Sequence, residues 1–313
     1  MKSNKNRLIS VVVLVIFLAI FGFYFAANID SFKILLDIKP VYILLAAIGH
    51  ITVIGLNGVL IKKILVPFKV HLSRRDSFYV SLISSIGNFF LPMQSGAAIR
   101  AVYLKKQYKL AYDNFITILS GNYVVVFFIN SLVGLLTIFF LRNVATTSEF
   151  VVLGLTFLSI FVVTVLTAFT KLVDKYLELL ARIMPWEKIK NSATKIKTGW
   201  RMIIGDKKLL RDLIGLTISS LVVNLFIIQS EFTSLGLNSI FWAVVLIATL
   251  DSVVLILNFT PASLGIREVI LIFSATALGL TVPEILSLAI IDRSIKFIVL
   301  SSGWIILHTK KIF

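Results

Sequence analysis

The chain has 313 residues, of which 58% are hydrophobic and 15% are charged, and its mean hydropathy is +0.99. Because soluble domains carry about 25% charged residues, this composition excludes an ordinary soluble fold and indicates a protein embedded largely in lipid. In such a protein the formal charge of +16 points to basic loops at a membrane surface rather than to nucleic acid.

Long apolar runs in the first half of the chain, residues 1–170, are predicted to be membrane-spanning helices. They cover residues 8–27, 41–61, 114–141 and 150–170. Each has the length of about 20 residues that a helix needs to cross a bilayer. The run at 8–27 follows basic residues, but it is longer than the apolar core of a signal peptide, so we interpret it as a retained span.

The apolar run at 78–91 is too short to cross. Its 14 residues would extend about 21 Å as a helix, whereas the hydrocarbon core is about 30 Å thick. Arg100, Lys105 and Lys106 follow within a few helical turns. The sequence therefore predicts that this stretch dips into the membrane and returns to the side from which it entered.

A basic segment separates the first half from the second half, residues 213–313. Residues 171–212 combine apolar residues at helical spacing with many Lys and Arg, which predicts amphipathic helices on the inner leaflet. Further apolar runs cover 213–230, 240–257, 269–280 and 285–307. We therefore expect one integral membrane domain over 1–313, an all-α polytopic protein with about eight membrane-embedded helical segments.

Loop charges predict the orientation of these segments. Positive charge is in excess in the loops at 1–7, 62–76, 100–113, 171–212 and 308–313. The intervening loops are neutral or, at Glu231 and Glu284, acidic. Since Lys and Arg mark cytoplasmic loops, we expect a multi-pass plasma-membrane protein with both termini in the cytoplasm and these two acids outside.

The same order of residues interrupts an apolar segment once in each half. An Asn is followed by Pro, Gly and Arg at Asn88, Pro92, Gly96 and Arg100, and again at Asn258, Pro261, Gly265 and Arg267. The predicted spans bring the chain to these two breaks from opposite sides, which indicates an inverted repeat and a transport site near the midplane. The alternative, that Pro and Gly only kink buried helices, stays open at this point.

Charged residues also occur within or beside the apolar segments of the second half, where such groups face the protein interior or water. They are Asp251, Arg267, Glu268, Asp292, Arg293 and Lys296. In one interpretation they form a closed network, with Asp292 and Lys296 on one helical face. In the other, Arg100 and Arg267 bind a lipid phosphate in a cavity formed by the breaks, with Glu268 beside them.

Histidine and acid patterns predict no catalytic residues, no metal and no other cofactor. His50, His71 and His308 lie far apart in the sequence, and no His-Glu-x-x-His or Asp-x-Asp pattern is present. His50 and Asn57 share a face of the second span, which we interpret as a hydrogen-bonded contact between helices.

Two motifs resemble a known family. Residues 261–268, Pro-Ala-Ser-Leu-Gly-Ile-Arg-Glu, are similar to the Pro-Gly-Gly-Leu-Gly-Val-Arg-Glu signature of the lysylphosphatidylglycerol synthase transmembrane-region family. Residues 91–100, Leu-Pro-Met-Gln-Ser-Gly-Ala-Ala-Ile-Arg, resemble its Pro-x-x-x-Gly-Glu-x-x-Arg motif, with Ala97 where the family has an acid. Ala262 and Ser263 replace the Gly-Gly of the second motif.

The resemblance covers nearly the whole chain and implies a stand-alone, flippase-like membrane domain without the aminoacyl-transferase domain. The leading hypothesis is a translocator of a phosphate-bearing lipid, such as an aminoacylated phospholipid or a polyprenyl-phosphate-linked glycan. Alternatives are a membrane-embedded enzyme that modifies a lipid carrier, and a non-transporting partner of a lipid or glycan synthase. We expect contact with anionic phospholipids, a separate synthase or a homo-oligomer as partners, and no nucleic acid.

Overall fold

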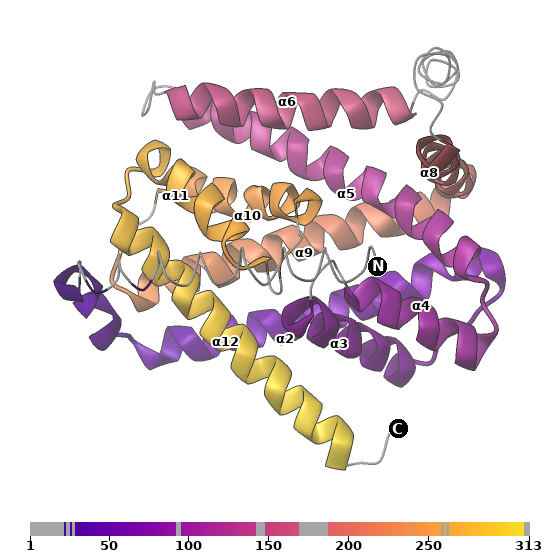
Figure 1. Ribbon diagram of the computed structural model, residues 1–313, viewed down its shortest axis with the longest axis horizontal. Coiled ribbons are helices and arrows are strands. Elements are labelled where there is room, and N and C mark those ends of the chain that lie inside the picture. Colours follow the sequence, from indigo (N-terminus) through magenta and orange to yellow (C-terminus); the bar gives the residue numbers. More distant parts are fainter. Residues whose placement is uncertain are drawn as a thin grey trace.

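The computed structural model describes residues 22, 26, 29–91, 95–141, 148–168, 187–238, 240–257, 260 and 263–309 (Figure 1). Every secondary-structure element in these residues is a helix. The helices are η1 (Ile29–Leu36), α2 (Pro40–Ile64), η2 (Val66–Phe68), α3 (Arg74–Phe90), α4 (Ser95–Tyr108), α5 (Tyr112–Leu141), α6 (Ser148–Ala168), α8 (Glu187–Gly205), α9 (Lys207–Ser234), α10 (Phe241–Ile256), α11 (Ile266–Leu278) and α12 (Val282–Thr309). The predicted all-α class is confirmed.

Four of the described helices are long and apolar enough to cross a membrane: α2 with η2, α5, α6 and α9. They correspond to the spans predicted at 41–61, 114–141, 150–170 and 213–230. The run at 240–257 forms the shorter apolar helix α10. The first predicted span, 8–27, lies outside the described residues except for Gly22 and Ala26.

The long helices form a bundle around α9 (Figure 1). α2 packs against α9, and α5 packs against both α6 and α8. α10 lies between α5 and α9, whereas α12 crosses α2 and α3 obliquely. α11 packs against both α10 and α12, so these three helices of the second half meet one another.

Two apolar cores fill the bundle, one toward each end of α2. Core A includes Ala46, Phe157 and Leu246, and core B includes Ile61, Leu104 and Leu213. On α2, His50 lies between the residues that enter the two cores, and it is itself buried. The boundary between the cores is therefore where the polar groups of the bundle collect.

α3 and α4 form an antiparallel helical hairpin. The Ser73 hydroxyl caps α3, accepting from the Asp76 amide (3.0 Å) and donating to the Asp76 carboxylate (2.7 Å). The Tyr108 hydroxyl at the end of α4 donates to the same carboxylate (2.9 Å). The bond from Ser73 is the largest cause of a lowered pKa at Asp76. Toward the other end of the hairpin, the Ser84 hydroxyl donates to the Gly96 carbonyl (3.1 Å), so the helices pack along their length.

The described part of the predicted amphipathic segment 171–212 lies in α8 and at the start of α9. Residues 171–186 lie outside the described residues, and residues 207–212 begin α9. α8 packs on α5 so closely that a methyl group at Gly199 would overlap the carbonyl oxygen of Thr117. Ile203 is fully buried, and Lys195 pairs with Asp113 (2.8 Å). One face of the basic helix is thus fixed to the bundle.

Replacing Gly199 with Ala should lower the midpoint of thermal unfolding in detergent, because the clash is with backbone and the helices must separate. Overpacking of this kind costs about 1–3 kcal/mol. Gly205→Ala, on the same helix with no atom near the added methyl, is the matched control and should be neutral or slightly stabilising. Equal midpoints for the two variants would contradict the close packing of α8 on α5.

Candidate functional site

Charged and titratable side chains from α2, α9, α10, α11 and α12 gather at the boundary of the two cores. They are His50, Glu231, Asp251, Arg267, Glu268, Asp292, Arg293 and Lys296. Most are buried, so each needs a partner of opposite charge to be stable in an apolar surrounding. All six charged residues singled out in the second half belong to this cluster.

Arg267 is the centre of the ion pairs. Its Nε donates to Asp251 Oδ1 on α10 (3.1 Å), and its Nη1 donates to Asp292 Oδ2 on α12 (2.8 Å). Lys296 Nζ donates to the same Asp292 oxygen (2.9 Å), so the predicted pairing of Asp292 with Lys296 is present. Arg267 thereby ties α10, α11 and α12 together through one planar group.

The start of α11 explains two further residues of the second break. Gly265 has φ +83°, a left-handed conformation that favours glycine. Its amide donates to Glu268 Oε2 (2.8 Å), which satisfies a free N–H at the helix N-terminus. The other oxygen of Glu268 accepts from Arg293 Nε (2.7 Å). Glu268 is thus both a cap for α11 and the ion-pair partner of Arg293 on α12.

The first break is held by hydrogen bonds to uncharged acceptors. The Gly96 amide donates to Asn88 Oδ1 (2.9 Å), and Arg100 Nε donates to the Ser84 hydroxyl (3.0 Å). No carboxylate in the described part of the chain forms an ion pair with Arg100. Asn88 and Gly96 therefore join α3 to α4, and Arg100 stabilises the hairpin through a hydroxyl.

The two breaks meet at one cavity of about 290 Å³. Asn88 and Phe89 line it from the end of α3, and Ser263 and Arg267 line it from the second break. The other lining residues include His50, Asp251, Asp292, Arg293 and Lys296. Among the described residues, Arg100, Gly96, Gly265 and Glu268 are not part of this lining. The remaining candidates, Pro92, Asn258 and Pro261, lie outside the described residues.

Apolar grooves adjoin the charged cavity. A groove of about 510 Å³ shares Phe89 and Arg293 with the cavity and continues past Phe297 on α12. A second groove of about 690 Å³ shares Phe90 with the first and runs between α3 and α12 toward Trp304. The site therefore has a polar end inside the bundle and an apolar extension along α3 and α12.

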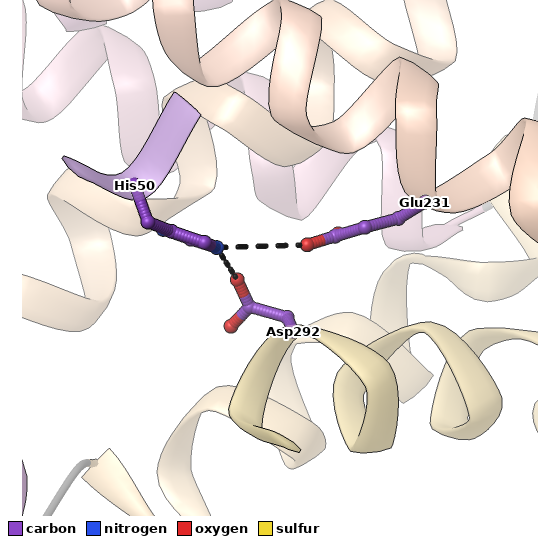
Figure 2. Close-up of side chains that lie close together, drawn as sticks. All are labelled: His50, Glu231 and Asp292. Carbon is purple, nitrogen blue, oxygen red and sulfur yellow. Dashed lines mark ion pairs between the residues drawn. The ribbon is translucent and has the colours of Figure 1, made fainter. Parts of the chain in front are cut away.

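His50, Glu231 and Asp292 point toward one another from α2, α9 and α12 (Figure 2). His50 Nε2 lies 3.5 Å from Asp292 Oδ1 and 3.9 Å from Glu231 Oε1. One ligand atom from each residue lies within 4.8 Å of the other two, which is close enough to surround a single cation. Arg267 and Lys296 already hold the second oxygen of Asp292.

Glu231 was not expected at this site. The expectation that it lies in an external loop is wrong, because α9 continues to Ser234 and the residue is only 2% exposed. An acid near the end of an apolar run resembles an interfacial residue in the sequence. The signal that could have identified it is the polar partner at His50, which we interpreted only as a helix contact.

A family model described as "Lysylphosphatidylglycerol synthase TM region" matches residues 7–302. The chain belongs to this family. Membership agrees with the two motifs in the sequence and with the long apolar helices, so the protein is a multi-pass helical membrane protein of the lysylphosphatidylglycerol synthase transmembrane-region family. Comparison with curated proteins and with solved structures gives no match.

Asp292→Asn should destabilise the protein strongly. Lys296 loses its carboxylate partner, and Arg267 loses one of its two. Breaking a buried pair costs about 3–5 kcal/mol, measurable as a lower midpoint of thermal unfolding. Adding Lys296→Met should recover part of the loss. Asp30→Asn removes an exposed pair with Lys33 and should change little. If Asp292→Asn unfolded at the same temperature as the wild type, the prediction would be contradicted, and the Asp292 carboxylate would be in contact with water rather than buried.

Proposed function

We propose that the protein moves a phosphate-bearing lipid between membrane leaflets without changing the lipid headgroup chemically. The observation that carries this proposal is the joining of a charged cavity to apolar grooves, where two interrupted helical segments from distant parts of the chain meet. Irregular backbone is tolerated at membrane depth where it lines protein or a water-filled cavity. Transport sites are commonly built from such broken segments.

Arg267 is suited to hold the phosphate. A guanidinium has five N–H donors in a planar fork, and the ion pairs to Asp251 and Asp292 use two of them. Those carboxylates orient the fork and offset its charge while the cavity holds no anion. Lys296, whose side chain is 33% exposed, lies on the same cavity wall and supplies a second cation.

The apolar grooves are suited to acyl chains. Their linings are almost wholly apolar, with Phe89, Phe90 and Phe297 in contact with one another between the cavity and the grooves. A lipid whose headgroup enters the cavity could keep its chains in this apolar surface, so the charged part alone needs a polar path. This division of the lipid supports translocation more than it supports headgroup chemistry.

Arg267→Lys should slow lipid movement by about ten- to hundredfold, because an ammonium lacks the planar five-donor fork that can hold two carboxylates and still bind a phosphate. That range corresponds to the roughly 1.5–3 kcal/mol of a hydrogen bond to a charged group. The measurement is dithionite quenching of fluorescent phosphatidylglycerol in vesicles that contain the purified protein. Arg75→Lys, exposed at the start of α3, is the control.

An unchanged rate in Arg267→Lys, with normal folding, would contradict the assigned role of Arg267. Mass spectrometry of the recovered lipid separates transport from chemistry. An intact headgroup supports translocation, and an altered headgroup would favour the alternative of a lipid-modifying enzyme.

The proposal includes an orientation in which the α3–α4 hairpin enters and leaves the membrane from the cytoplasmic side. Since the chain has no cysteine, single cysteines at the exposed positions Arg74 and Gln107 should both react with an impermeant thiol reagent only in inside-out vesicles. A cysteine at exposed Ser148 is the opposite-side control and should react only in right-side-out vesicles. Reaction of positions 74 and 107 from different sides would contradict the re-entrant arrangement and the inverted repeat.

A further inference from the structure

Glu231 and His50 are buried polar groups that the ion pairs of Arg267, Arg293 and Lys296 leave out. Their side chains are 3% and 9% exposed. Neither Glu231 Oε1 nor His50 Nε2 has a hydrogen-bond partner in the described part of the chain, and these two atoms face each other at 3.9 Å. Because buried polar atoms are almost always satisfied, this pair requires an explanation.

The charges of the cluster do not balance when His50 is neutral. The carboxylates are Glu231 on α9, Asp251 on α10, Glu268 on α11 and Asp292 on α12. The fixed cations are Arg267 on α11 with Arg293 and Lys296 on α12. Four acids thus face three cations. The unmatched charge falls on Glu231, since each of the other acids forms an ion pair with Arg267, Arg293 or Lys296 at less than 3.2 Å.

We propose that Glu231 and His50 together bind one proton, and that this proton enters and leaves with the transported lipid. The inference rests on the proposed function, because it names the ion that accompanies lipid movement. The proton comes from water in the charged cavity and returns to water. Only O–H and N–H bonds form and break, and no oxidant or other reactant is needed.

His50 provides the path between water and the acid. His50 lines the charged cavity, whereas Glu231 instead lines a separate pocket of about 10 Å³ on the far side of Arg267. The imidazole of His50 faces Glu231 at 3.9 Å, and its two ring nitrogens allow it to act as a shuttle between the cavity and the acid.

A proton fits the cluster better than a divalent metal ion. One proton brings the sum of the charges to zero, whereas a divalent ion leaves one positive charge in excess beside Arg267 and Lys296. These two cations already bind Asp292, the third group that would have to hold the ion. The repulsion is strong because Coulomb interactions are weakly screened in a buried site.

The proton also explains how a cavity lined by acids accepts a phosphate. With Glu231 ionised, the cluster has excess negative charge and repels an entering anion; with the proton bound, this repulsion is removed. Because coupling between two binding events is reciprocal, an anion in the cavity favours proton uptake to the same degree.

The first experiment detects the proton without lipid transport. In purified protein at neutral pH, infrared spectroscopy should show the carbonyl stretch of a protonated carboxyl that Glu231→Gln removes, or nitrogen-15 NMR should show a charged His50 imidazole. Glu284→Gln and His71→Gln, at residues outside the cluster, are matched controls and should change neither signal. His50→Gln gives a second reading if Glu231→Gln fails to fold, and it should shift the Glu231 signal.

The second experiment measures coupling with fluorescent phosphatidylglycerol in proteoliposomes. A difference of one pH unit should shift the steady-state distribution of the label between leaflets by about tenfold for each proton coupled. Glu231→Gln should abolish the shift, whereas Glu284→Gln should behave as the wild type.

The outcomes separate this inference from the proposed function. If the wild type moves lipid but the pH difference does not change the distribution of the label, proton coupling is overturned and translocation is still supported. A proton signal without any lipid movement supports the proton site and overturns translocation. Absence of both proton signals overturns the site. A further outcome is that Zn²⁺ raises the midpoint of thermal unfolding of the chelator-treated wild type but not that of Glu231→Gln. That result would overturn the proton site and show that these residues bind a metal ion.

Discussion

The structure depends on one constraint: a charge inside an apolar helix bundle must be matched by an opposite charge or by water. Arg267 meets it by bridging Asp251 and Asp292, and Glu268 meets it by pairing with Arg293. Removing one partner of such a pair costs more than the pair contributes, because the remaining charge stays buried. The cluster therefore determines where α10, α11 and α12 can lie relative to one another.

The same constraint accounts for the position of the cavity. Helical interruptions leave backbone N–H and C=O groups without intrahelical partners, and lipid cannot satisfy them. At the first break Asn88 accepts from Gly96, and at the second Glu268 accepts from Gly265. Side chains thus replace the missing helix bonds, and polar and charged side chains are among those that line the space between the two breaks.

Much of this arrangement could be predicted from the sequence, because apolar length and loop charge are local properties. The spans around α2, α5, α6 and α9 follow from apolar runs, and the pairing of Asp292 with Lys296 follows from their spacing. The two matched breaks predicted that distant segments contribute to one site, and in the structure Asn88 and Arg267 line the same cavity.

Other features depend on tertiary packing that one sequence does not reveal. The sequence distinguishes Arg100 from Arg267 only by the acid that the first motif lacks at Ala97. In the described part of the chain Arg267 lines the cavity and Arg100 does not, because Arg100 points back to Ser84 within its own hairpin. Glu231 was placed in a loop because its burial depends on how far α9 continues and on which helix faces it. Composition near a helix end cannot distinguish an acid at the membrane interface from one enclosed by neighbouring helices.

The unequal closeness of the contacts within the cluster has a mechanical consequence. Charged hydrogen bonds of 2.7 to 3.1 Å tie α10, α11 and α12 together, whereas His50 on α2 faces Asp292 and Glu231 at 3.5 and 3.9 Å without a hydrogen bond. If a rigid-body displacement widened the cavity, the electrostatic attraction opposing it would be weakest at the contact between His50 on α2 and Asp292 on α12. The helices α10, α11 and α12 would then move as one unit against α2 and α9, and protonation of His50 would alter the force between His50 on α2 and Asp292 on α12.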